Sequence, residues 1–88
     1  MKQEEQVNMT ISSVMKKKGQ KVVHVRFERK QDGKLHFAEG IVPDCTFEKV
    51  YGFSEEEMAQ LKFYLKENMH TIFEEAQKIN EKEFWLHR

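Results

Sequence analysis

This sequence of 88 residues contains only one cysteine, one proline and no long apolar run. Cys45 alone cannot form a disulfide within the chain, which fits a reducing compartment. No apolar stretch approaches the roughly 18 residues that a membrane span requires. No charged start is followed by an apolar segment and a cleavage site, so we see no signal peptide. The sequence therefore predicts a cytoplasmic protein with no membrane partner.

The spacings that metal sites, phosphate loops and catalytic centres require are also missing. The four histidines show neither His-x-x-x-His nor Cys-x-x-Cys spacing, and the four glycines are isolated rather than grouped in a phosphate-binding loop. A reactive cysteine needs an adjacent base and an oxyanion site, whereas Cys45 has the parity of a small core residue near Phe47. We therefore predict a protein that is not an enzyme and uses no metal or cofactor.

The chain does contain enough large apolar side chains for one small core, with seven Phe, five Met and one Trp. Two domains are excluded, because half of this chain could not bury an adequate core without disulfides or a bound metal. We expect a flexible polar leader over residues 1–8 and a single domain over residues 9–88. The formal net charge is zero, yet residues 1–34 carry a net charge of +5 and residues 35–88 a net charge of −5. The two parts of the chain are therefore oppositely charged.

Alternation of apolar and polar residues predicts an antiparallel meander of three strands, roughly 9–15, 21–29 and 34–42. After Pro43 the alternation is less regular, so a short fourth strand is left as an alternative. A polar leader and an apolar tail, Phe84-Trp85-Leu86, flank the folded part. We expect this tail to fold back over the core, because it is too apolar to remain in water.

Both turns between these strands are predicted as three-residue loops, over 17–19 and 31–33. Each triplet ends in a glycine, which adopts the left-handed conformation of such loops without steric cost. A loop over 31–33 pairs Phe27 with Phe37 and keeps the apolar residues on one face. A two-residue turn would pair Phe27 with Ala38 and mix the two faces, so we reject it. The same rule over 17–19 gives the pairs Ile11–Val25 and Met9–Phe27.

The strongest local signal is the start of a helix at Ser54. The Ser54 side chain can accept the N–H of Glu57, and the Glu57 carboxylate can accept the N–H of Ser54, which is a capping box. Apolar residues at steps of three and four continue to about residue 80. A helix of about 27 residues would be about 40 Å long, against a domain diameter of about 30 Å. We favour one long amphipathic helix, with a bend or a break near Asn68 as the alternative.

Two surfaces are candidates for binding. On the helix, Phe63 and His70 project away from the apolar stripe, and Trp85 lies in the tail. Exposed aromatic residues often anchor protein interfaces. The second surface is basic and would meet the phosphates of a nucleic acid. Its predicted contact residues are Lys17, Lys18, Lys21, Arg26 and Lys34.

The predicted register makes the basic surface the weaker of the two candidates. It directs Phe27 and Phe37 toward the core, so the basic face has no aromatic side chains on which bases could stack. Lysines on hairpin loops also serve simply to keep a sheet edge from pairing. Nucleic-acid binding therefore remains the alternative rather than the leading hypothesis.

We predict an α+β protein in which an antiparallel β-meander of three to four strands packs one face against one long C-terminal helix. The leading functional hypothesis is a small intracellular, non-enzymatic protein-interaction module that binds a protein partner or, as we favour, a second copy of itself, as in a homodimer. Its motivation is the overlong helix and the opposed charges of the two parts of the chain. The alternative is a nucleic-acid-binding accessory protein that contacts phosphates through its basic strands and hairpin loops.

Overall fold

The computed structural model describes residues 6–86, and the side chains of residues 6–81. Within this range the fold is α+β, as predicted, with an antiparallel five-stranded sheet and two consecutive helices. The elements are β1 (Asn8–Ile11), β2 (Met15–Lys17), β3 (Gln20–Gln31), β4 (Lys34–Val42), β5 (Thr46–Tyr51), α1 (Glu55–Glu67) and α2 (Met69–Leu86). Residues 1–5 of the predicted leader lie outside the described residues, and β1 begins at Asn8.

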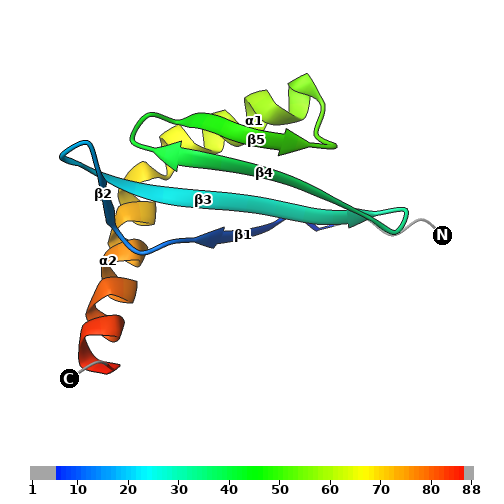
Figure 1. Ribbon diagram of the computed structural model, residues 1–88. Helices are drawn as coiled ribbons and strands as arrows, with labels where there is room; N and C mark the ends of the chain where they lie inside the picture. The colour runs from blue at the N-terminus through cyan, green and yellow to red at the C-terminus, as the bar shows by residue number, and fades with distance from the viewer. Residues whose placement is uncertain (1–5, 87–88) are drawn as a thin grey trace.

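The molecule has two layers, a sheet and a pair of helices that lie on one of its faces (Figure 1). The strand order is β1-β3-β4-β5, and β2 pairs with the first residues of β3. We call the face toward the helices the inner face and the opposite one the outer face. In the part of the chain that is described, no helix is long and apolar enough to cross a membrane.

The core lies between the inner face and the two helices. Alternate residues of β3 enter it, since Val23, Val25 and Phe27 are buried while His24 and Arg26 between them are only half-buried. The helices contribute residues of the predicted apolar stripe, which confirms its periodicity. The buried core residues are Val23, Val25, Phe27, Val42, Cys45, Leu65, Ile72 and Ala76. Burying each large aliphatic side chain stabilises the fold by about 1.5–3 kcal/mol.

The predicted three-residue loop over 31–33 is wrong. Gln31 pairs with Lys34, so the turn contains only Asp32 and Gly33, and both have positive φ angles, 54° and 76°. Two positive φ angles are characteristic of a type I′ turn, whose twist matches that of the strands it connects.

This turn shifts the register of β4 by one residue. Phe27 therefore pairs with Ala38 rather than with Phe37. Ala38 is fully buried, whereas Phe37 moves to the outer face, where the guanidinium of Arg26 lies over its ring. The prediction failed because it assumed that a phenylalanine in a strand must face the core. In the structure the small residue of β4 is directed toward the helices.

The predicted strand 9–15 is two strands, because the chain leaves the sheet between Ile11 and Met15. The first turn is again a two-residue turn, since Lys17 pairs with Gln20. The irregular residues 12–14 restore the register that a three-residue loop would have given. Ile11 consequently lies opposite Val25, as predicted.

The start of the helix is confirmed and its length is not. The Ser54 hydroxyl accepts the N–H of Glu57 at 3.1 Å, and the Glu57 carboxylate accepts the N–H of Ser54 at 2.8 Å. The favoured prediction of one long helix is wrong and the alternative of a break near Asn68 is confirmed, because α1 ends at Glu67 and α2 begins at Met69. Asn68 separates them, and both its backbone N–H and its side-chain amide donate to the carbonyl of Tyr64, at 3.0 and 2.9 Å. After this break α2 takes a different direction from α1 and runs past β3 and beyond the sheet (Figure 1).

The apolar tail does not fold back. α2 continues to Leu86 and its C-terminal end projects beyond the sheet (Figure 1). The side chains of Phe84, Trp85 and Leu86 lie outside the described side chains. The prediction that these side chains cover the core therefore lies outside the described part of the structure.

Candidate functional site

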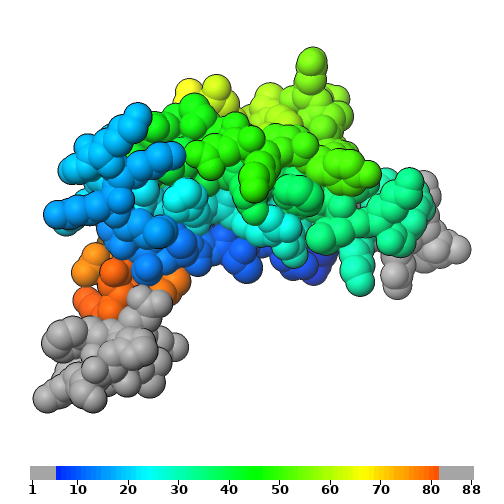
Figure 2. Space-filling view, in the orientation of Figure 1, coloured from blue at the N-terminus to red at the C-terminus, as the bar shows by residue number. Residues whose placement is uncertain are grey.

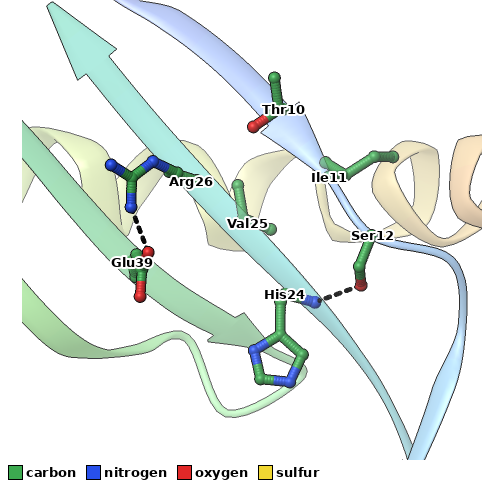
Figure 3. Close-up of a pocket in the computed structure, with 7 residues that line it drawn as sticks. All are labelled: Thr10, Ile11, Ser12, His24, Val25, Arg26 and Glu39. Atoms are coloured by element: carbon green, nitrogen blue, oxygen red, sulfur yellow. Dashed lines mark hydrogen bonds and ion pairs between the residues drawn. The ribbon is translucent and has the colours of Figure 1, made fainter.

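A shallow pocket of about 360 Å³ opens on the outer face between β1, β3 and β4 (Figure 3). It exists because the chain leaves the sheet after Ile11, so β1 no longer covers β3 there. Ser12 holds this break in place. Its hydroxyl accepts the backbone N–H of His24 at 3.0 Å, and its own N–H donates to the His24 carbonyl at 2.9 Å. The His24 side chain extends from the same strand segment at the lower end of the pocket (Figure 3).

Arg26 is the charged group at the centre of this face. Its guanidinium donates to the carboxylates of Glu28 and Glu39. The hydrogen bond to Glu28 is the main reason that the pKa of Arg26 is raised above its usual value, and Glu39 contributes less. The two carboxylates together carry more charge than the guanidinium of Arg26, which reduces its attraction for a phosphate group. This arrangement argues against Arg26 as a phosphate contact.

Beside Arg26, two aromatic rings continue across the outer face. The guanidinium carbon lies 4.5 Å from the centre of the Phe37 ring. Phe37 in turn stacks on Tyr51, with ring centres 6.2 Å apart and an angle of 25° between the rings. The row Arg26, Phe37 and Tyr51 thus crosses β3, β4 and β5. Sequence reasoning missed it because Phe37 was assigned to the core.

The structure separates the five predicted phosphate contacts. The hairpin between β2 and β3 carries Lys17, Lys18 and Lys21. Lys17 also forms an ion pair with Glu48, with 3.3 Å between Nζ and Oε2. Lys34 belongs to the other hairpin, opposite Gln31. Lys21 and Gln31 are ten residue steps apart along β3, which is about 33 Å at about 3.3 Å per step. Of the five predicted contacts, only the three on the first hairpin form a group, together with Lys16 opposite Lys21.

Of the predicted protein contacts, two have described side chains and both are exposed. Phe63 on α1 is 64% exposed. The His70 side chain on α2 is 88% exposed and lies 3.1 Å from the Glu74 carboxylate. Trp85 lies in α2, and its side chain falls outside the described ones. The structure places Phe63 and His70 at the surface, as predicted, and leaves their role in binding a prediction.

The β5 side of the molecule exposes several large apolar side chains. Val50 and Tyr51 on β5 are 44% and 56% exposed, and Tyr64 on α1 is 42% exposed. Tyr64 and the β5 residue Phe47 both contact Phe27 with their rings, which places this part of α1 near β5 on the inner face. Atoms of α1 are visible beyond β5 in Figure 2. β5 is also an end strand of the sheet, so one of its edges has no neighbouring strand among the described residues.

Arg29 connects the sheet to the start of α1. Its Nη2 donates to a carboxylate oxygen of Glu57 at 3.1 Å, and its Nε donates to Nδ1 of His36 at 3.2 Å. Its guanidinium carbon also lies 4.5 Å from the centre of the Phe53 ring. The hydrogen bond from Arg29, together with that from the Ser54 backbone, lowers the pKa of Glu57 to about 2. Sequence analysis gave Arg29 no role, because nothing in the local pattern relates it to a helix 28 residues away.

Residues 6–81 contain no group of three or more His, Cys, Asp or Glu side chains that could hold a metal ion. Cys45 is buried in the core, as its parity predicted. The described surface offers apolar area, the outer edges of the two end strands β1 and β5, and separate groups of charge. Comparison with known proteins found no matching family model, no matching curated protein and no matching solved structure.

Proposed function

We propose that this protein is a small non-enzymatic protein-interaction module that associates with itself. The observation that carries the proposal is the amount of large apolar surface left uncovered. Among residues 6–81, eight large hydrophobic residues are 38–64% exposed: Val7, Met9, Met15, Leu35, Val50, Tyr51, Phe63 and Tyr64. Single exposed hydrophobic residues are ordinary, but four of these eight, Val50, Tyr51, Phe63 and Tyr64, lie on β5 and on the helix α1 that follows it. Such a group on neighbouring elements is typical of an interface.

The distribution of charge supports association between copies. The group Lys17, Lys18 and Lys21 lies at the β2–β3 hairpin, whereas Glu55 and Glu56 lie in the first turn of α1, just after β5. Arg29 and Glu57 hold this first turn against β3 near its other end. Two copies that face in opposite directions would therefore bring basic and acidic ends together, which favours their encounter.

The proposal is tested by measuring self-association of the full chain by sedimentation velocity over a range of concentrations. We expect concentration-dependent dimers, and we expect Phe63→Ser to weaken them because the 64% exposed ring would lose its contact with the partner. Gln77→Ser, at an exposed position of α2, is the matched control and should behave as the unchanged chain. A chain that stays monomeric at every concentration would contradict the proposal.

A second candidate is binding of nucleic acid by the β2–β3 hairpin. It is favoured by the grouping of Lys17, Lys18 and Lys21 and by Phe37, which lies on the outer face and not in the core. Fluorescence anisotropy with mixed-sequence single-stranded oligonucleotides tests it. Binding should weaken steeply with salt, and Lys18→Ala with Lys21→Ala should weaken it further, while Lys34→Ala at the distant hairpin should not. Binding that does not depend on salt would exclude this candidate.

A further inference from the structure

We propose that two copies of this chain join through the free edges of their β5 strands, antiparallel and related by a two-fold axis, into one continuous sheet. This inference rests on the proposed self-association and names its contact surface. β5 spans Thr46–Tyr51, and the sheet order leaves one of its edges without a neighbouring strand in the described chain. A free edge presents unpaired backbone N–H and C=O groups that another strand can bind.

The sequence of β5 is complementary to itself when it is reversed. If all six residues pair with their counterparts across a two-fold axis, the axis passes between Glu48 and Lys49. Glu48 of one copy then lies opposite Lys49 of the other, and this ion pair occurs twice. In the same register Phe47 lies opposite Val50, and Thr46 lies opposite Tyr51. Charged residues therefore meet opposite charges, and apolar residues meet apolar ones.

The faces of the strand agree with this register. Gly40 pairs with Phe47 and Ala38 pairs with Val50, and the buried Ala38 is directed toward the helices. Phe47 and Val50 therefore both belong to the inner face, so they can meet across the axis. Tyr51 pairs with Phe37 on the outer face. Thr46 of the second copy, which lies opposite Tyr51 in this register, would share that face.

A bulge in β5 strengthens the case for a second copy of this chain as the partner. The register with β4 shifts between Glu39 and Gly40, so that Glu48 is an extra residue in β5. A bulge normally protects an edge, because its irregular spacing does not fit a regular strand. An identical strand in the reverse direction has the same spacing. The bulge therefore disfavours other strands and is matched in a self-pair.

Charge outside the strand supports the antiparallel direction. Lys17 and Lys18 lie next to Thr46 and Glu48 around one shallow pocket, at the start of β5. Glu55 and Glu56 follow the end of β5. In an antiparallel pair the start of one β5 lies beside the end of the other, so the lysines of one copy approach the glutamates of its partner. A parallel pair would place like charges together.

Lys49 and Glu48 are free to make the proposed contacts. Lys49 forms no ion pair with any side chain of residues 6–81. Glu48 contacts Lys17 through its Oε2 atom at 3.3 Å, which leaves Oε1 for a second partner.

Reversing the charges of Glu48 and Lys49 tests the proposed β5–β5 interface. Dimerisation of the full chain is measured by sedimentation equilibrium. Lys49→Glu and Glu48→Lys each place like charges opposite each other, and each should weaken the dimer by about tenfold or more. The double variant restores opposite charges and should recover most of the affinity. Lys30→Glu, an exposed change of the same charge on β3, should leave the dimer unchanged.

A second measurement on the unaltered chain does not depend on how the variants fold. In a dimer of labelled and unlabelled copies, isotope-filtered nuclear Overhauser effects should connect Phe47 of one copy with Val50 of the other. Their absence in a dimer, or equal dimerisation of all charge variants, would overturn the β5–β5 interface while the proposed function stands. A chain that remains monomeric would overturn both.

Discussion

Arg29 is the residue that joins the two layers at the end of the sheet farthest from the basic hairpin. Its side chain is only 13% exposed, so its charge must be compensated within the protein. Glu57 supplies the opposite charge, and Nδ1 of His36 accepts a hydrogen bond from Arg29 Nε. Glu57 also closes the capping box of α1. One carboxylate therefore both starts the helix and holds it on the sheet.

Removing the charge of Glu57 should destabilise the fold in a pH-dependent way. The pKa of Glu57 is lowered from 4.5 to about 2. A lowered pKa stabilises the folded state above pH 4.5, and this contribution is lost as the pH falls from about 4.5 to about 2. Glu57→Gln keeps a capping side chain but loses the charge. Because 36% of the Glu57 side chain is exposed, we expect a loss of only about 1–2 kcal/mol at pH 7 after discounting for solvent screening.

The measurement is the free energy of unfolding by urea at several pH values. The difference between the unchanged chain and Glu57→Gln should be constant above pH 5 and shrink toward pH 2. Glu56→Gln is the matched control, because Glu56 is an exposed residue of the same turn. A difference that does not change with pH would show that the charge of Glu57 does not stabilise the fold.

Among the elements, the break between β1 and β2 is held by a side chain from α2. The amide of Asn80 substitutes for a neighbouring strand, because its Oδ1 accepts the N–H of Val14 at 2.7 Å and its Nδ2 donates to the Val14 carbonyl at 3.4 Å. Backbone groups that leave a sheet need such partners when they are partly buried. α2 is thus tied to the one irregular part of the β1–β2 segment.

Asn80→Ala should free the backbone of Val14 and destabilise the fold by about 1–2 kcal/mol, the cost of leaving partly buried polar groups unpaired. Amide hydrogen exchange should then speed up at Val14 more than in the core strand β3. Gln77→Ala on the exposed side of α2 provides the comparison and should change neither quantity. Unchanged exchange at Val14 would show that water replaces the Asn80 amide without cost.

The elements also show which features the sequence could predict. The capping box at Ser54 depends on neighbouring residues alone, and the apolar stripe depends on a simple period, so both were predicted correctly. The register of β4 depends on whether Phe37 has a partner on the outer face. That partner is the guanidinium of Arg26, on another strand. Hydrophobicity alone could not show that the ring of Phe37 would be covered by a charged side chain.

The candidate surfaces were predicted only in part for the same reason. Exposure of Phe63 and His70 followed from their positions on the helix. The separation of Lys34 from Lys17 depends on the length of β3, which continues to Gln31, beyond the predicted strand. The free edge of β5 depends on strand order, which local patterns do not contain.

At the scale of the whole molecule, the two ends of the sheet differ in charge and the dimer should respond to salt. The chain measures 49 × 26 × 20 Å, so its ends are farther apart than the Debye length of about 8 Å at physiological salt. Raising the salt concentration should therefore weaken the proposed attraction between opposite ends without abolishing the apolar contacts. Sedimentation equilibrium at low and high salt should show a weaker dimer at high salt. A dimer that strengthens with salt would indicate that apolar contacts alone hold the copies together.

Cys45 gives the molecule a chemical reporter of its own opening. It is the single cysteine of the chain, it is 1% exposed, and it packs in the same core as Leu65, Ile72 and Ala76. A thiol reagent can reach it only after the core has opened around it, when the helices leave the inner face or the turn between β4 and β5 opens. The rate of its modification, followed under native conditions, therefore measures how often this part of the core opens.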